Sequence, residues 1–313
     1  MGRAANLAAV ASNAEHHLGY RNRLINSDFR VDQYNNGASV AATAEVFVVD
    51  RFVTRVVGGG SAQRLASGLA ETPFKVRLTG SGSAIAAYLG QYIESRNCLD
   101  LVGSPFTVSF YAAASAAASI TARLIFFGTA DDRLSSVSTQ TLSRNITSTL
   151  TRYSVTFPSL PASVTNGLYV ELSGSIGTGW IDFAALQSEE GSGATPLEFR
   201  DIGRELDMCN RHYVALANLS GAWPSTKFGF GAGTGTSSTQ IVCPLPTSMR
   251  SVPDHVYWSG VSTTVGGAST AVSGIVIDTA TASSVQVTVT GATYALGQTV
   301  FLQGGTLAFS AEI

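Results

Sequence analysis

Charged side chains are scarce in this sequence of 313 residues, where Asp, Glu, Lys and Arg together make up 13 %, against about 25 % in typical soluble proteins. Lysine occurs only as Lys75 and Lys227. The hydrophobic share of 45 % excludes an intrinsically disordered chain. The net charge of −2 argues against a nucleic-acid partner held by a basic surface. The surface must therefore rely on Ser, Thr, Asn and Gly, or be covered by copies of the same chain.

Cysteine is also rare in this sequence, and long apolar runs are absent from it. Cys98, Cys209 and Cys243 are an odd number without paired spacing, which favours buried free thiols over disulfides or a zinc site. No run approaches the about 20 apolar residues of a membrane helix, and the N-terminus lacks the character of a signal peptide. We expect a soluble protein, made in a reducing cytosol, that does not insert into membranes.

Recognisable catalytic motifs are missing. The sequence contains four histidines, no Gly-x-Ser-x-Gly elbow and no His-Glu-x-x-His motif. The acidic doublet Glu189-Glu190 would point to opposite faces of a strand, so it does not form a glycosidase pair. The glycine-rich segment 229–235 lacks the Gly-Lys-Ser/Thr ending of a phosphate loop, and we expect it to be a flexible or tightly turned loop. These absences predict a protein that is not an enzyme.

A short helix is predicted at the N-terminus, followed by many short strands. Apolar residues recur every three or four positions within residues 1–18, so residues 1–20 are expected to form a helical segment for attachment or oligomerisation. From residue 24 onward the period becomes two, with turn signals such as Asn35-Asn36-Gly37 between the runs. The expected strands lie at 24–31, 46–53, 75–78, 106–112, 120–127, 153–157, 168–172 and 180–183. This pattern predicts an all-β sandwich over residues 21–200.

A second helix is predicted over residues 203–216, with Asp201 as its N-cap and an apolar stripe formed by Leu206, Cys209, Tyr213 and Leu216. It opens a smaller, β-rich C-terminal domain, residues 201–313, whose role would be oligomerisation, receptor contact or both. Of the 40 Lys, Arg, Asp and Glu residues, five follow residue 213. The expected strands of this domain lie at 239–243, 254–258, 274–278, 285–290 and 299–303.

Aromatic and amide side chains are the best candidates for ligand binding, because aromatic rings stack on sugar faces and amides bond to hydroxyl groups. The alternative is that most of these rings belong to the sandwich core. The predicted glycan-binding residues are Trp223, Tyr88, Tyr92, Trp258 and Gln91.

Several segments resemble phage tail-fibre and other virion structural proteins. The opening residues 22–29, Gln33-Tyr34 and Val49-Asp50-Arg51-Phe52 resemble the start of such proteins, with Ser27, Tyr34 and Phe52 in place of their usual Gly, Arg and Trp. Residues 88–94 with 106–112 resemble the inner strands of carbohydrate-binding-type jelly rolls. The longest similar stretch is 180–213, followed by 249–253. The resemblance implies a jelly roll and a component of a phage or gene-transfer-agent-like particle.

The resemblance implies a fibre or spike that binds host cell-surface polysaccharide without catalysis, located in the virion and made in the bacterial cytoplasm. Two alternatives are a structural adaptor between the particle and another receptor-binding protein, and a polysaccharide-degrading tailspike. The expected partners are further copies of the chain, as a trimer or else a pentamer, and other virion proteins. No cofactor is expected except a structural Ca²⁺, for which jelly rolls of this type imply oxygen ligands from Asn26, Asp28, Asp182 and Glu189.

Overall fold

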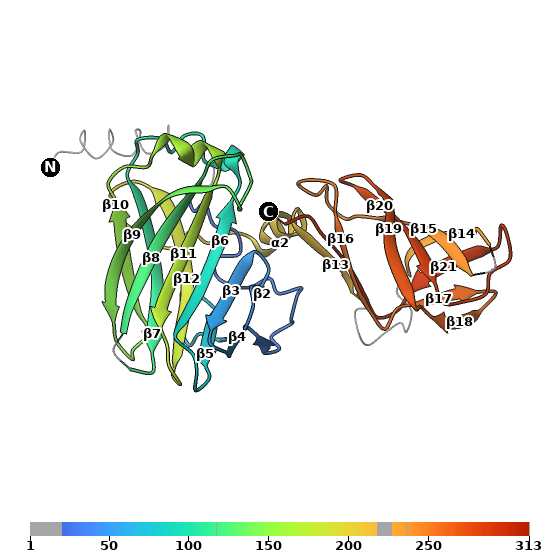
Figure 1. Ribbon diagram of the computed structural model, residues 1–313, viewed down its shortest axis with the longest axis horizontal. Helices are drawn as coiled ribbons and strands as arrows, with labels where there is room; N and C mark the ends of the chain where they lie inside the picture. Colours follow the sequence, from blue (N-terminus) through green and yellow to red (C-terminus); the bar gives the residue numbers. More distant parts are fainter. Residues whose placement is uncertain (1–20, 117, 218–226, 236, 313) are drawn as a thin grey trace. The chain divides into compact units, whose positions relative to one another are not determined.

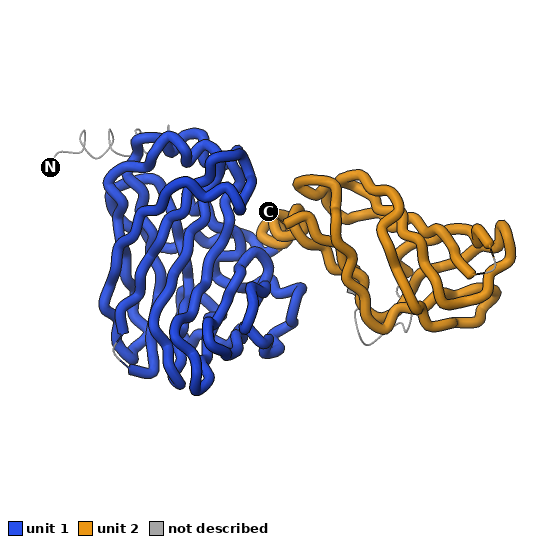
Figure 2. The backbone as a smooth tube through the Cα atoms, in the orientation of Figure 1, with its two compact units in different colours: residues 1–202, 313 blue, residues 203–312 orange. Residues whose placement is uncertain are grey.

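The computed structural model describes residues 21–116, 118–217, 227–235 and 237–312. Internal contacts divide the chain into two compact units, one ending at Ile202 and one spanning Gly203–Glu312 (Figure 2). Nearly all regular structure in both units is strand (Figure 1). The predicted helical segment 1–20 lies outside the described residues. No helix in the described ranges has the length and hydrophobicity needed to cross a membrane.

Unit 1 is a sandwich of two six-stranded sheets (Figure 1). The first sheet has the order β1 (Val40–Ala41), β4 (Gly60–Ala66), β5 (Phe74–Gly80), β12 (Trp180–Glu190), β7 (Phe106–Ala114), β10 (Thr151–Phe157). The second has the order β2 (Val46–Val49), β3 (Phe52–Val57), β6 (Ala86–Ile93), β11 (Leu168–Ser175), β8 (Ala118–Phe127), β9 (Ser136–Ile146). Short 3-10 turns, η1 (Ser95–Asn97) and η2 (Ala162–Asn166), lie between strands. The predicted all-β sandwich is confirmed.

The core of unit 1 follows from the alternation along each strand. In β8, Ile120, Leu124 and Phe126 are fully buried in the core cluster, whereas Thr121, Arg123 and Ile125 are partly exposed. Successive side chains of a strand point to opposite faces, so each inner strand presents one apolar face to the core and a second face to its surroundings.

The predicted strand at 24–31 is wrong, because this segment folds into consecutive turns. Asn26 and Phe29 both have φ of 59°, in the left-handed region. The buried Asn26 amide donates hydrogen bonds to the carbonyls of Val31 (2.7 Å) and Asp50 (2.9 Å), and its side-chain oxygen accepts one from the Val31 amide (2.9 Å). An asparagine side chain thus supplies the bonds that a strand neighbour would have supplied.

Unit 2 contains two further sheets. After α2 (Ile202–Asn210), a three-stranded sheet has the order β13 (Tyr213–Ala217), β22 (Thr306–Ser310), β16 (His255–Ser259). A seven-stranded sheet has the order β18 (Ala268–Ala271), β17 (Ser262–Val265), β21 (Thr299–Gln303), β14 (Lys227–Gly233), β15 (Ser238–Pro244), β20 (Ser284–Thr290), β19 (Gly274–Ala280). The five strands predicted for this region fall on β15, β16, β19, β20 and β21. All three cysteines are buried free thiols, as predicted.

The predicted helix over 203–216 is too long, since α2 ends at Asn210 and Tyr213 begins β13. The apolar stripe belongs in part to a strand: β13 pairs with β22 from Tyr213 to Ala217, and Tyr213 and Val214 are buried there. Pairing with a strand almost a hundred residues away overrides the local helical spacing.

The prediction of a loop at 229–235 is also wrong for most of its length, because Gly229–Gly233 lies inside β14 between β15 and β21. A Cβ atom on Gly231 would lie 1.7 Å from the Gln240 carbonyl oxygen, and one on Gly229 would lie 2.4 Å from that of Val242. The glycines therefore allow close approach of neighbouring backbones rather than chain mobility.

We predict that Gly231→Ala lowers the free energy of unfolding by about 1–3 kcal/mol, because the added methyl group overpacks the β14–β15 contact. Urea unfolding of the full chain measures this loss. The matched control is Gly235→Ala, where no atom lies within 4 Å of the added carbon and the change should stay within about 0.5 kcal/mol. Equal losses in both variants would contradict the packing explanation.

Candidate functional site

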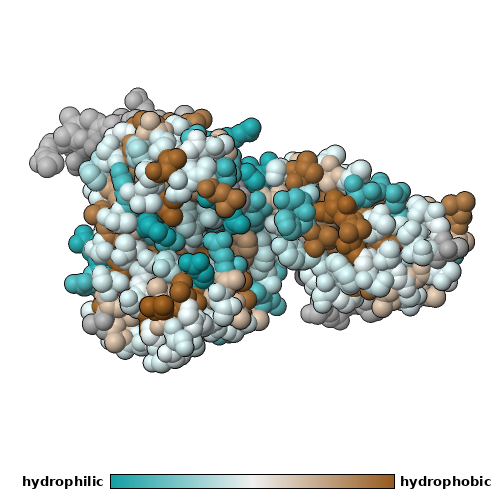
Figure 3. Space-filling view, in the orientation of Figure 1, coloured by the Kyte–Doolittle hydropathy of each residue, from teal (hydrophilic) through white to brown (hydrophobic). Residues whose placement is uncertain are grey.

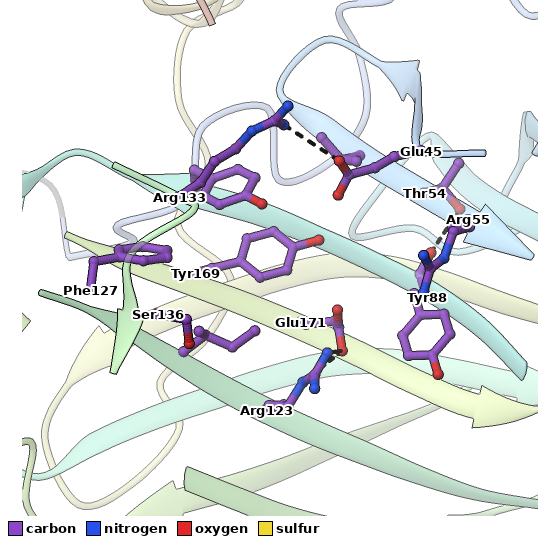
Figure 4. A pocket seen from close by; sticks show the side chains of 13 residues that line it. Glu45, Thr54, Arg55, Tyr88, Arg123, Phe127, Arg133, Ser136, Tyr169 and Glu171 are labelled. Atoms are coloured by element: carbon purple, nitrogen blue, oxygen red, sulfur yellow. Dashed lines mark hydrogen bonds and ion pairs between the residues drawn. The ribbon is translucent and has the colours of Figure 1, made fainter. Parts of the chain in front are cut away.

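The second sheet of unit 1 carries a cavity of about 220 Å³ on its outer face. Its lining comes mainly from β3, β6, β8 and β11, with Glu45 before β2 and Arg133 after β8 (Figure 4). Hydrophilic residues gather over the β6–β11 region on the visible face of unit 1 (Figure 3).

Strand register arranges the lining side chains in three rows across the sheet. The central row places Gly90 of β6 opposite Glu171 of β11, which in turn lies opposite Arg123 of β8. On one side, Tyr92 lies opposite Tyr169. On the other side, Arg55 of β3 lies opposite Tyr88 of β6, and this pair forms the third row. Residues two apart on a strand share a face, so neighbouring rows are separated by about 7 Å.

The Tyr92–Tyr169 row is an aromatic surface. The two rings stack with centroids 4.2 Å apart and an interplanar angle of 26°, and Phe127 extends the stack 6.1 Å from Tyr92. A Cβ atom on Gly90 would lie 2.5 Å from the ring and hydroxyl of Tyr169. The absence of a side chain at Gly90 is therefore what allows the Tyr169 ring to lie across β6, with its hydroxyl directed toward the space between Glu45 and Glu171 (Figure 4).

The central row contains an ion pair between a buried carboxylate and a partly exposed guanidinium. The Glu171 Oε1 atom accepts a hydrogen bond from Arg123 Nε at 3.0 Å and lies 2.7 Å from Arg123 Nη2, while the Glu171 side chain is 6 % exposed. Burial raises the pKa of Glu171 above its ordinary value of 4.5, and the positive charge of Arg123 opposes this increase only in part. Glu171 therefore titrates at a higher pH than an exposed glutamate.

Two further guanidinium groups lie at the edges of the cavity. Arg133 forms an exposed ion pair of 3.4 Å with Glu45 and lies 6.0 Å from the centroid of Tyr92. Arg55 lies 5.4 Å from the centroid of Tyr88. Burial raises the pKa of Tyr92 to about 12 and that of Tyr169 well above 10, so both phenols stay protonated at neutral pH and can donate hydrogen bonds.

Two of the five predicted glycan-binding residues, Tyr88 and Tyr92, line this cavity. Gln91 does not: it faces the other side of β6, is 1 % exposed, and exchanges hydrogen bonds of 2.7 Å with both the amide and the carbonyl of Ile25. Trp258 belongs to β16 in unit 2, and Trp223 lies outside the described residues.

The sequence analysis did not predict the charged residues that line the cavity. Arg123 and Glu171 occupy the polar positions of alternating runs at 120–127 and 168–172, which indicates that they face away from the core. Only the pairing of β8 with β11 brings them together. The alternation also indicated that Gln91 would not join the two tyrosines. Gln91 is three residues from Tyr88 and one from Tyr92, and residues an odd number of positions apart on a strand point to opposite faces.

The side chains of the four residues predicted as Ca²⁺ ligands all make contacts within the protein. Asp182 accepts hydrogen bonds from Arg77 at 2.7 and 2.8 Å and lies 2.8 Å from Lys75 Nζ. Glu189 accepts from Thr195, Asp28 forms an ion pair of 2.5 Å with Arg30, and the Asn26 amide is bound to backbone. Within the described ranges, no group of three or more His, Cys, Asp or Glu residues is placed to hold a metal. These oxygens are engaged by neighbouring protein groups, and a structural Ca²⁺ at them stays a prediction.

No family model and no curated protein matches the sequence. Solved structures do show likenesses. A putative sugar-binding protein from Bacteroides thetaiotaomicron is 14 % identical, with 54 % of this chain and all of that chain covered and a TM-score of 0.38. TmCBM61, solved with beta-1,4-galactotriose, is 12 % identical, with 55 % of this chain and all of that chain covered and a TM-score of 0.36. The enzymatically active domain of bacteriophage CBA120 tailspike protein 4 is 17 % identical, with 55 % of this chain and 22 % of that chain covered and a TM-score of 0.35.

Proposed function

We propose that unit 1 is a carbohydrate-binding module and that the chain is a phage virion fibre or spike protein that binds host cell-surface glycan without cleaving it. The observation that carries the glycan-binding proposal is the cavity at Gly90, where the stacked Tyr92 and Tyr169 rings lie beside the Glu171–Arg123 pair. The sequence resemblance to virion structural proteins supports the location.

The chemistry of the cavity suits a sugar. The C–H-bearing faces of a pyranose ring pack on aromatic side chains, while its hydroxyl groups need both donors and acceptors. Tyr92 supplies apolar ring surface, Glu171 supplies acceptor oxygens, and Arg123 supplies donors. Ion pairing and ring stacking hold these groups in place before ligand arrives, which reduces the entropy lost on binding.

Two carboxyl groups in one cavity also raise the alternative of glycoside hydrolysis, since a glycosidase needs an acid with a raised pKa and a second carboxylate. Glu171 has the raised pKa, and Glu45 is the second group. Each of them is nevertheless paired with an arginine, at 2.7 Å and 3.4 Å respectively. Such pairing stabilises the ionised form of Glu171 and so opposes a role as proton donor. Binding without cleavage is therefore our proposal.

Unit 2 is proposed to join copies of the chain into an oligomer, with a trimer favoured. The outer face of its seven-stranded sheet exposes Phe230 (66 %), Val276 (61 %) and Val242 (44 %). Phe230 lies directly opposite Val242 in the β14–β15 register. Large exposed apolar groups that lie next to one another are typical of surfaces that another protein covers. Several copies on one particle would raise the avidity of a weak glycan site about 10²–10⁴-fold.

We predict that Tyr92→Ala weakens glycan binding about tenfold, because it removes an aromatic face worth about 1.4 kcal/mol. Screening the full chain on a glycan array and titrating a bound glycan by calorimetry measures the loss. The matched control is Trp258→Ala, which alters a partly exposed ring in unit 2 and should leave binding unchanged.

Incubation of the full chain with the glycan that it binds should release no reducing ends. Loss of binding in Trp258→Ala but not in Tyr92→Ala would move the site to unit 2. Absence of glycan binding by the intact oligomer would favour the structural adaptor, and release of reducing ends would favour the tailspike alternative.

A pH profile follows from the raised pKa values of Glu171 and Tyr92. As pH falls through the raised pKa of Glu171, the carboxylate is protonated and loses acceptor capacity, so binding should weaken at a higher pH than an ordinary glutamate would cause. Toward alkaline pH, the Tyr92 pKa of about 12 keeps that phenol protonated, so binding should stay constant up to about pH 10. Calorimetry across pH tests both limbs. Persistence of the acidic limb in Glu171→Gln would assign it to another group.

We predict that Phe230→Asp shifts the oligomer toward monomer, because the new carboxylate would have to be desolvated in the contact. Sedimentation velocity of the full chain measures the change in mass. Ala268→Asp, at an exposed position of β18, is the control and should keep the mass of the unaltered protein. A monomeric unaltered protein would refute the oligomer proposal.

A further inference from the structure

The cavity of unit 1 carries more positive than negative charge. Among its lining residues, all of which are described, three are arginines and two are glutamates: Arg55, Arg123 and Arg133, with Glu45 and Glu171. The whole chain has a net charge of −2, so this local excess runs against the overall balance.

The three guanidinium groups differ in how they are engaged. Arg123 is bound to the buried carboxylate of Glu171 through both Nε and Nη2. Arg133 forms a 3.4 Å pair with Glu45 in which the two side chains are 43 % and 46 % exposed. Within the described part of the chain, Arg55 makes no hydrogen bond or ion pair; its guanidinium lies 5.4 Å from the centroid of the Tyr88 ring, and its positive charge acts on Glu171 without a direct bond. Arg55 is therefore the source of the excess charge.

We propose that the glycan bound in this cavity is acidic and that a sugar carboxylate binds the Arg55 guanidinium beside Tyr88. This inference rests on the proposed glycan-binding function and specifies its ligand class. The planar fork of arginine donors matches a carboxylate with two parallel hydrogen bonds, and such charge-assisted bonds are the stronger ones.

The geometry of the rows favours this placement. Arg55 lies directly opposite Tyr88 in the β3–β6 register, so a sugar ring on Tyr88 would bring a substituent within reach of the guanidinium. The nearest acidic row, that of Glu171, is about 7 Å away along the strands, and Arg123 neutralises it. A ligand carboxylate at Arg55 thus meets one unpaired cation and no unpaired anion of the cavity.

The charge of Glu45 sets a limit on the orientation. Its carboxylate is partly exposed and held by a single ion pair with Arg133, so an anion close to it would be repelled. Acidic sugars are therefore expected to bind with the carboxylate toward Tyr88 and with uncharged ring surface toward Tyr92.

The test is a glycan array that contains uronic-acid oligosaccharides together with the same oligosaccharides after reduction of the carboxyl groups to alcohols. Titration calorimetry of the full chain with the best matched pair then gives both dissociation constants. Arg55→Gln keeps the size and polarity of the side chain but removes its charge. Arg96→Gln is the control, because Arg96 is an exposed arginine of η1 outside the cavity.

We expect the acidic member of the pair to bind about tenfold more tightly than the reduced one. Arg55→Gln should abolish that difference while keeping the affinity for the reduced oligosaccharide, Arg55→Lys should retain part of it, and Arg96→Gln should behave as the unaltered protein. The preference should also decline as salt is added.

Two results would overturn this inference while leaving the proposed function intact. One is binding confined to neutral glycans, or equal affinity for both members of the pair. The other is an acidic preference that survives in Arg55→Gln. Absence of binding to every glycan, acidic or neutral, would instead overturn the proposed function itself.

Discussion

The candidate site depends on the antiparallel register of β6, β11 and β8. That register places Gly90, Glu171 and Arg123 in one row and Tyr92 beside Tyr169 in the next. A shift of one residue would turn Glu171 and Arg123 into the apolar core and expose core side chains such as Leu172 and Leu124. The core therefore fixes the register, and the register fixes the site. Glu171 can lie buried on this face because the partly exposed Arg123 neutralises its charge.

Glycine acts in two ways that composition alone does not separate. At Gly90, the missing side chain allows Tyr169 to lie across the sheet and so shapes the cavity. At Gly229 and Gly231, it allows the backbones of β14 and β15 to approach within a sheet of unit 2. In both cases the glycine is required by a close contact and not by mobility. A glycine-rich segment in a β-rich chain is thus compatible with a strand when its neighbours pack closely on it.

The two units show contrasting surfaces. Unit 1 places arginines and glutamates around a cavity on its second sheet, whereas the outer face of the seven-stranded sheet in unit 2 exposes Phe230, Val242 and Val276. Polar groups around an aromatic surface suit a hydroxylated ligand, and exposed apolar strands suit another protein surface. This contrast is the basis of our proposal that unit 1 binds glycan and that unit 2 joins copies of the chain.

The sequence by itself determined that the protein is all-β, because its apolar residues alternate with period two in runs such as 106–112 and 120–127. Both of these runs are strands of the sandwich. It also indicated Tyr88 and Tyr92, whose spacing places both on one face of β6. Only the tertiary structure decided which residues join them. Three other strands supply them: β3 carries Arg55, β8 carries Arg123, and β11 carries Glu171 and Tyr169. The partner of a strand is set by packing of the whole core.

The same reason explains the wrong predictions. Gln91 bonds to Ile25, residues 213–217 pair with β22, and residues 24–31 form turns around the Asn26 amide. Local pattern defines which way a side chain points along its own strand, whereas its neighbours are chosen by contacts between segments far apart in the chain.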